Sequence, residues 1–292
     1  MKQRIVTATL AVTVLGGLVA GCAPAVVAPA TNPPAVSSPA PPAAATVEPT
    51  TAPAPAPIQV PLPATPDRST LPLIDPFAIT PWAVDGTADP PAEQLAHIGT
   101  TGAVAYATPG GEPLGLILSQ TVSDASVVPV HEVAYGGAWL RVGLTSRRSL
   151  PGEGPVNGAT GWIHADDVAS LGPITTRVTV NLSTRTLTIT EAGVETYSTE
   201  VAVGAPDTPT PTGQTFLVSR WTEDSATPQV AVLSFHSEVL ATFNGGPGVT
   251  SIHTFRGATT GAVSHGCVRI PDSAWQAVSA LPIGTPTTIT ED

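Results

Sequence analysis

Short apolar or alternating runs, separated by turns rich in Gly and Pro, follow one another from residue 103 to the C-terminus. Alternation with period two is typical of strands that bury one face, and such runs between Gly and Pro clusters are typical of all-β domains. The runs predict strands at residues 103–107, 114–118, 127–133, 138–144, 161–168, 177–182, 185–190, 194–203, 215–219, 230–235, 249–253 and 286–290. We therefore expect a mainly β protein.

Two further features refine this pattern. The runs 177–182 and 185–190 flank Ser183-Thr184, which predicts a hairpin. The spacing predicts one helix that begins near Pro271, with Asp272 in its first turn and Trp275, Val278 and Leu281 as its apolar stripe.

The strands fall into two groups. Residues 101–172 contain Trp139-Leu-Arg-Val142 and Gly161-Trp-Ile163, which resemble the bacterial SH3-like domain, a small barrel. Residues 175–292 form a second β-rich unit. Residues 77–100 are a transition that the pattern does not assign to either unit.

The N-terminal part carries a different signal. Lys2 and Arg4 precede an apolar run over residues 5–20, which is too short to span a bilayer as a helix. The run ends in Val19-Ala20-Gly21-Cys22, which resembles the lipobox of bacterial lipoproteins and implies that residues 1–21 are a signal peptide and that Cys22 is acylated. The alternative is an ordinary signal peptide in which this cysteine is incidental. Residues 22–76 are rich in Pro, Ala and Thr without apolar periodicity, so we expect a disordered linker.

Charge excludes several classes of function. Only 11% of the residues are charged, and the net charge is −11, whereas a nucleic-acid binder needs a basic surface. Lys2 is the only lysine, which argues against P-loop chemistry, Schiff-base chemistry and a Ser–Lys dyad.

The segment 251–270 concentrates the groups that could do chemistry. It holds His253, His265 and Cys267, the only cysteine besides Cys22. A thiol becomes a nucleophile when a nearby imidazole takes its proton, and Gly266 lets the backbone approach a substrate carbonyl closely. These residues predict a cysteine nucleophile. A papain-like order fails because no histidine follows Cys267. A zinc site built from His236, His253, His265 and Cys267 lacks the usual paired spacing.

His253 and the run Ser264-His-Gly-Cys-Val-Arg269 resemble the active-site motif of the L,D-transpeptidases (YkuD type). Val203-Gly204, Thr210-Pro-Thr-Gly213 and Phe243-Asn-Gly-Gly246 extend the resemblance over the second unit. The resemblance implies a β-sandwich or barrel-like catalytic domain.

The resemblance also implies a role for each residue of the motif. Cys267 is the nucleophile, His253 is its base, and the carbonyl of Thr254 orients the imidazole. His265 supports the loop and the acyl pocket, and Ser264 and Arg269 bind substrate, Arg269 through a carboxylate. The backbone amides of residues 265–267 form the oxyanion hole. We do not assign His236 to the cleft, and the resemblance implies neither a metal nor another cofactor.

The reaction implied is acyl transfer on peptidoglycan stem peptides through a thioester on Cys267, which gives 3–3 cross-links. An L,D-carboxypeptidase that uses the same residues with water, and a non-catalytic wall-binding lipoprotein, remain as alternatives. The lipid anchor implies an extracytoplasmic protein held at the bacterial membrane and acting in the cell wall. The oligomeric state is not indicated.

Overall fold

The structure is a computed structural model that describes residues 66–222 and 227–292. The predicted signal peptide, Cys22 and the predicted linker up to residue 65 lie outside the described residues. The prediction that this linker extends to residue 76 is wrong, because Arg68–Thr70 form a 3₁₀ turn and Ile74 is buried in the core of the first sheet. None of the helices in the described ranges is long and apolar enough to cross a membrane.

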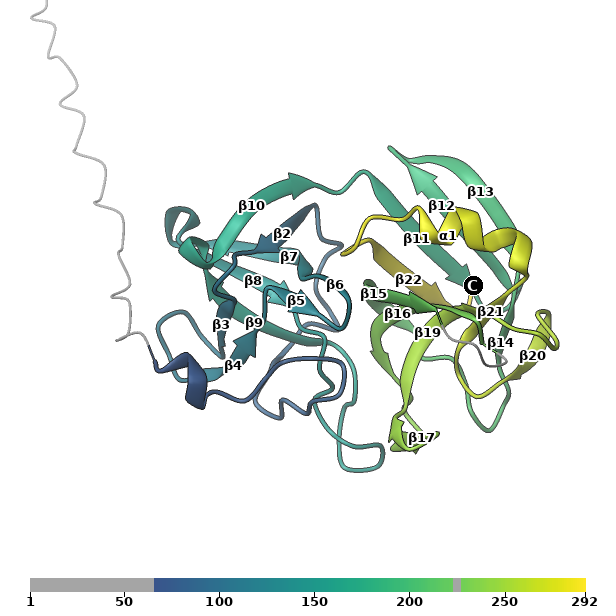
Figure 1. The fold of residues 1–292 in the computed structure, drawn as a ribbon, viewed down its shortest axis with the longest axis horizontal. Helices are drawn as coiled ribbons and strands as arrows, with labels where there is room; N and C mark the ends of the chain where they lie inside the picture. Colours follow the sequence, from purple (N-terminus) through teal and green to yellow (C-terminus); the bar gives the residue numbers. More distant parts are fainter. Residues whose placement is uncertain (1–65, 223–226) are drawn as a thin grey trace, which may run out of the picture. The chain divides into compact units, whose positions relative to one another are not determined.

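The first half of the described chain forms an eight-stranded, antiparallel sheet (Figure 1). Its strands are β1 (Val84–Asp85), β2 (Gln94–Ile98), β3 (Ala103–Tyr106), β4 (Pro113–Ile117), β7 (Val127–Ala134), β8 (Trp139–Gly143), β9 (Ala159–His164) and β10 (Val168–Pro173). The order is β10-β2-β7-β8-β9-β3-β4, with β1 paired to β9. Between β4 and β7, the chain forms a separate two-stranded hairpin of β5 (Gln120–Thr121) and β6 (Asp124–Ala125).

The segment 77–100, which the pattern left unassigned, contributes two of these strands. Strand β2 pairs with both β7 and β10, so it lies inside the sheet. Strand β1 has only two residues and no alternation that a sequence pattern could detect. The first sheet therefore begins earlier in the chain than the steady strand signal does.

The second half forms a ten-stranded mixed sheet in the order β13-β12-β11-β22-β15-β16-β19-β21-β14-β20. Its strands are β11 (Thr176–Asn181), β12 (Thr186–Glu191), β13 (Val194–Glu200), β14 (Ala202–Gly204), β15 (Gly213–Thr222), β16 (Gln229–His236), β19 (Val249–Thr254), β20 (Gly261–Ser264), β21 (Val268–Ile270) and β22 (Pro286–Thr290). Between β16 and β19, the chain forms a two-stranded hairpin of β17 (Thr242–Phe243) and β18 (Gly246–Pro247). The mainly β fold is confirmed.

The predicted hairpin and helix are both present. Strands β11 and β12 pair antiparallel across the expected turn. The helix is shorter than its apolar stripe suggests, because residues Asp272–Ala274 form a 3₁₀ turn and only Trp275–Ser279, α1, is α-helical. Val278 and Leu281 are buried, as the stripe predicts, whereas Trp275 is only partly buried.

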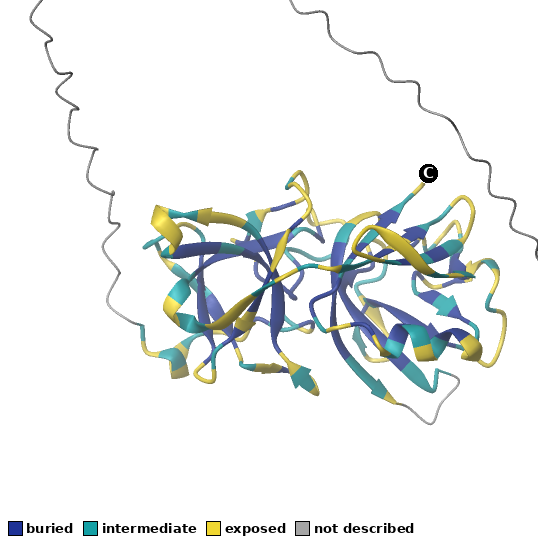
Figure 2. Cartoon of the chain, turned by 90° about the horizontal axis from the view of Figure 1, so that it is seen from above, coloured by how far each residue is buried: buried dark blue, intermediate teal, exposed yellow. Residues whose placement is uncertain are grey.

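Buried apolar residues connect the two sheets. Phe216 and Val218 of β15 belong to the same buried cluster as Val128 of β7 and Leu140 of β8. In Figure 2 the strand interiors are dark blue and many of the connecting turns are yellow. Because apolar burial is the main stabilising term in folding, this shared core holds the second sheet against the first.

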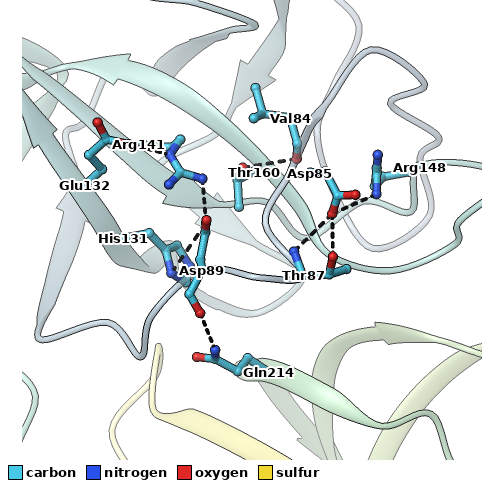
Figure 3. A network of polar contacts seen from close by, with 10 residues as sticks. All are labelled: Val84, Asp85, Thr87, Asp89, His131, Glu132, Arg141, Arg148, Thr160 and Gln214. Atoms are coloured by element: carbon cyan, nitrogen blue, oxygen red, sulfur yellow. Dashed lines mark hydrogen bonds and ion pairs between the residues drawn. The ribbon is translucent and has the colours of Figure 1, made fainter.

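A polar network joins the two halves beside this core (Figure 3). The carboxylate of Asp89 accepts a hydrogen bond from Arg141 of β8, and its backbone carbonyl accepts one from the Gln214 side chain of β15 at 2.7 Å. His131 lies 4.0 Å from the same carboxylate, and burial lowers the pKa of its imidazole. The segment before β2 is thus held by both sheets.

Candidate active site

Strand pairing brings the predicted nucleophile and base together. His253 lies in β19, and Cys267 occupies the turn that leads from β20 into β21. Strands β19 and β21 run parallel, with Ile252 opposite Val268 and His253 opposite Arg269. This register places residue 253 beside residue 267, although they are far apart along the chain.

The turn that carries Cys267 is held by its own side chains. Ser264 Oγ donates to the carbonyl of Cys267 at 2.6 Å and accepts the N–H of Gly266 at 3.1 Å. Gly266 has a φ of 115°, a conformation that residues with a Cβ rarely adopt. We expected Ser264 to bind substrate, but its side chain is buried inside the turn, where it sets the backbone path before the thiol.

His253 is oriented as a base toward the thiol. Its Nδ1 lies 2.8 Å from the carbonyl oxygen of Thr254. A carbonyl only accepts, so Nδ1 carries the proton and Nε2 is left to accept the proton of Cys267. The imidazole and the thiol line the same cleft, and each favours the charged form of the other. The predicted role of the Thr254 carbonyl agrees with this geometry.

The surroundings favour the charged forms of both groups. Burial alone raises the pKa of the Cys267 thiol, but the hydrogen bond and charge of His253 and the hydrogen bonds of Ser251 bring that pKa below its ordinary value. Burial also lowers the pKa of His253, but the hydrogen bond and charge of Cys267 and the Thr254 carbonyl raise it above its ordinary value. Each group therefore favours the charged form of the other.

Ser251 is a site residue that the motif did not reveal. Its hydroxyl donates to Cys267 Sγ at 3.4 Å. It stands two residues before His253 on a strand, so both side chains point to the same face. This period-two spacing is the signal that could have identified it.

Arg269 lies close to the pair without lining its cleft. Its guanidinium stacks on the ring of Phe255 with 3.9 Å between Cζ and the ring centroid, and the same ring meets His253 edge-on at 6.1 Å. Nε of Arg269 is buried without a partner, and burial lowers the pKa of the guanidinium. The predicted contact with a substrate carboxylate stays a prediction.

The two other histidines of interest have different surroundings, since His265 lines a small pocket next to Cys267 and His236 lines no part of the cleft. His265 is exposed, and its ring packs at a tilt against Phe243 with 5.2 Å between centroids. His236 is fully buried, and its Nε2 lies 2.7 Å from the carbonyl oxygen of Pro76. His236 therefore does not line the cleft.

Cys267 is partly exposed and opens onto a cleft of about 320 Å³. Ser251 and His253 line it from β19, Trp221 and Val230 from β15 and β16, and Phe243 from the β17 strand. Pro76 and Phe77 complete it from the segment before the first sheet, and nothing in their sequence pattern indicated this position. Within residues 66–222 and 227–292, no group of three or more His, Cys, Asp or Glu side chains could hold a metal ion.

A thiol paired with an oriented imidazole beside an open cleft is the arrangement of an enzyme that transfers acyl groups through cysteine. Residues 175–289 match the family model described as the L,D-transpeptidase catalytic domain, YkuD. This segment is an L,D-transpeptidase catalytic domain. No curated protein matches the sequence.

Several solved structures are similar to the chain. An L,D-transpeptidase from Mycobacterium tuberculosis H37Rv is 16% identical and covers 71% of this chain and 100% of its own, with a TM-score of 0.36. L,D-transpeptidase 3 from Mycobacterium tuberculosis, in complex with a faropenem-derived adduct, is 15% identical over 72% and 99%, with a TM-score of 0.35. The L,D-transpeptidase of Enterococcus faecium is 18% identical over 39% of this chain, with a TM-score of 0.32, and the match spans 49% of that protein.

Proposed function

We propose that the protein is a peptidoglycan L,D-transpeptidase that forms 3–3 cross-links through a thioester on Cys267. Cys267 and the oriented imidazole of His253 line one open cleft inside a segment that matches the L,D-transpeptidase family, and this observation carries the proposal. The family match supports peptidoglycan stem peptides as the substrate class. The pair of Cys267 and His253 supports the thioester chemistry.

In the first half-reaction, Nε2 of His253 takes the thiol proton and the thiolate of Cys267 attacks the carbonyl carbon of the third residue of a tetrapeptide stem. A C–S bond forms and the carbonyl electrons move to oxygen. The C–N bond then breaks, and the imidazolium returns the proton to the departing amine of the terminal D-alanine. The thioester remains on the enzyme.

In the second half-reaction, the amine of a neighbouring stem attacks the thioester carbonyl. His253 takes the proton of this amine as the new C–N bond forms. The C–S bond breaks and the thiolate leaves, so the pair returns to its starting state. Water in place of the amine gives a shortened tripeptide instead of a cross-link.

Backbone N–H groups stabilise the oxyanion of each tetrahedral intermediate. We assign this role to the amides of His265 and Cys267, because the N–H of Gly266 already donates to Ser264. Arg269 binds a carboxylate of the stem through the edge of its guanidinium, since Phe255 covers one of its faces.

Mass spectrometry after treatment with a carbapenem tests the thioester chemistry. We expect one adduct on Cys267, no adduct on Cys267→Ala, and an unchanged adduct on the matched control Cys22→Ala. With a disaccharide-tetrapeptide as substrate, a cross-linked dimer supports the transferase and tripeptide alone supports a carboxypeptidase. An intact, folded protein that forms no adduct and no product contradicts both.

We further propose that Cys22 carries the lipid anchor and that the stretch from Cys22 to residue 65 tethers the enzyme to the membrane while it works in the cell wall. The supporting observation is the small-residue run before Cys22, followed by the Pro- and Ala-rich stretch. Fractionation of cells that express Cys22→Ala tests this proposal. Release into the soluble fraction is expected, and unchanged membrane retention contradicts it.

A further inference from the structure

Pro76 and Phe77 lie almost one hundred residues before the matched catalytic domain, yet they line the same cleft as Cys267 and His253. Phe77 is 55% exposed, and the exposed part of its ring faces this cleft.

The tip of the segment is a rigid turn. The side chain of Asp75 accepts the N–H of Phe77 at 2.8 Å, and its carbonyl accepts the N–H of Ala78 at 3.1 Å. Pro76 restricts φ between them. Thr80 donates its N–H to the carbonyl of Arg147 at 2.8 Å, which ties the chain after the tip to the first half of the protein.

The tip is also tied to the catalytic domain. Nε2 of the buried His236 donates to the carbonyl of Pro76 at 2.7 Å. The side chain of Asn157 pairs with both backbone groups of His236, accepting its N–H at 2.7 Å and donating to its carbonyl at 2.9 Å. Arg147 donates to the carbonyl of Ala241, just before the β17–β18 hairpin, at 2.9 Å. Phe77 is therefore held at a defined place in the cleft.

The side chains that line the cleft indicate what kind of ligand the Phe77 ring contacts. Among the described residues that line it, His253 and Cys267 are the only titratable ones, and none is Lys, Arg, Asp or Glu. Phe243 and Trp221 add further aromatic surface. The apolar and aromatic side chains among these described residues offer a surface on which an apolar stretch of peptide can pack.

We propose that Phe77 is a substrate-binding residue and that the segment before the first sheet completes the peptide site of the catalytic domain. The ring covers an uncharged part of the stem peptide bound next to Cys267. This inference rests on the proposed function. Full burial of a Phe side chain corresponds to a factor of about 10 to 100 in affinity, and Phe77 is already half-buried, so we expect about a tenfold contribution.

The test compares full-length Phe77→Ala and Phe77→Leu with Trp82→Ala. Trp82 is the matched control, because it is an aromatic residue on the same segment, is 80% exposed and does not line the cleft. Three quantities are measured: KM and kcat for the tetrapeptide donor, the rate at which iodoacetamide alkylates Cys267, and the donor concentration that protects Cys267 from alkylation.

We expect Phe77→Ala to raise KM and the protecting concentration about tenfold, Phe77→Leu to restore most of the loss, and Trp82→Ala to change neither. The alkylation rate without donor stays at the wild-type value, because the thiolate pair is untouched. An unchanged KM and protecting concentration in Phe77→Ala overturns the inference, as does a slower alkylation, which indicates damage to the pair.

Different results would contradict the proposed transpeptidase activity and the proposed contact between Phe77 and the substrate. A wild-type protein that binds the donor but turns over none of it contradicts the transpeptidase, while loss of protection in Phe77→Ala still supports the contact. A wild-type protein that turns over the donor with the same KM as Phe77→Ala contradicts only the contact. If the donor does not protect the wild-type thiol at all, both proposals fail.

Discussion

The pH dependence of stability should report the buried imidazole of His236. Burial, reinforced by the charge of Arg147 and only partly opposed by the carbonyl of Pro76, lowers the pKa of His236 to about 4. In the unfolded chain this pKa returns to about 6.5. As the pH falls below about 6.5, the unfolded state takes up a proton that the folded state takes up only near pH 4.

The sign of the effect follows from this difference. The free energy of unfolding is insensitive to His236 above about pH 6.5, and it decreases progressively as the pH falls toward about 4. Each unit of pKa difference corresponds to about 1.4 kcal/mol, so the linkage removes about 2.5 kcal/mol between pH 7.5 and pH 4.5.

Urea denaturation of wild type and His236→Gln at pH 7.5, 5.5 and 4.5 measures this loss. Glutamine keeps a donor for the Pro76 carbonyl but does not titrate. The carboxylates contribute equally to the pH dependence of both proteins, so their effect cancels in the difference between the two free energies of unfolding. This difference should shrink by about 2.5 kcal/mol between pH 7.5 and pH 4.5, which corresponds to about 1 M urea in the midpoint of unfolding. Parallel curves at all three pH values would refute a neutral, buried His236.

Three further substitutions test the site and its support. His253→Ala should move the pH midpoint for alkylation of Cys267 upward and slow the reaction at pH 7 at least about tenfold, since the imidazole lowers the thiol pKa; an unchanged profile contradicts the pair. Gly266→Ala, at a φ of 115°, should strain the turn by about 1–3 kcal/mol and reduce carbapenem acylation with unchanged circular dichroism. Asn157→Ala should leave the buried N–H and C=O of His236 unpaired and lower the free energy of unfolding by about 2–4 kcal/mol in urea titrations, whereas an effect below 1 kcal/mol argues against the pairing.

The sequence pattern identified the long strands and missed the short ones that shape the site. Strands β11 and β12 alternate over six residues each and were predicted with their hairpin. Strands β20 and β21 have four and three residues, so they carry too little alternation to be recognised. The predicted run 194–203 divides into β13 and β14, which end up at different places in the second sheet. A strand pattern gives the faces of a segment but not its partners.

The same limit applies to the site. The family resemblance supplied the predicted pairing of Cys267 and His253, and both residues line one cleft in the structure. Ser251 could have been predicted, because it lies two residues before His253 on the same strand. Ser264 was predicted to bind substrate, but its hydroxyl donates to the carbonyl of Cys267 and stabilises the turn. The residue type and spacing of a motif indicate which groups react, and only the register of β19 against β21 tells which of them face the thiol.

Pro76 and Phe77 show why part of the site escapes any motif. Pro76 meets His236 across 160 residues of chain, and no local pattern reports a contact of that separation. The family match begins at residue 175, after the whole first sheet, so its boundaries define the reacting groups but not the full cleft. Phe216 and Val218 of the second sheet are buried in one cluster with residues of the first sheet. The first sheet therefore acts on the catalytic half in two ways, by covering apolar residues of β15 and by anchoring the segment that places Phe77 in the cleft.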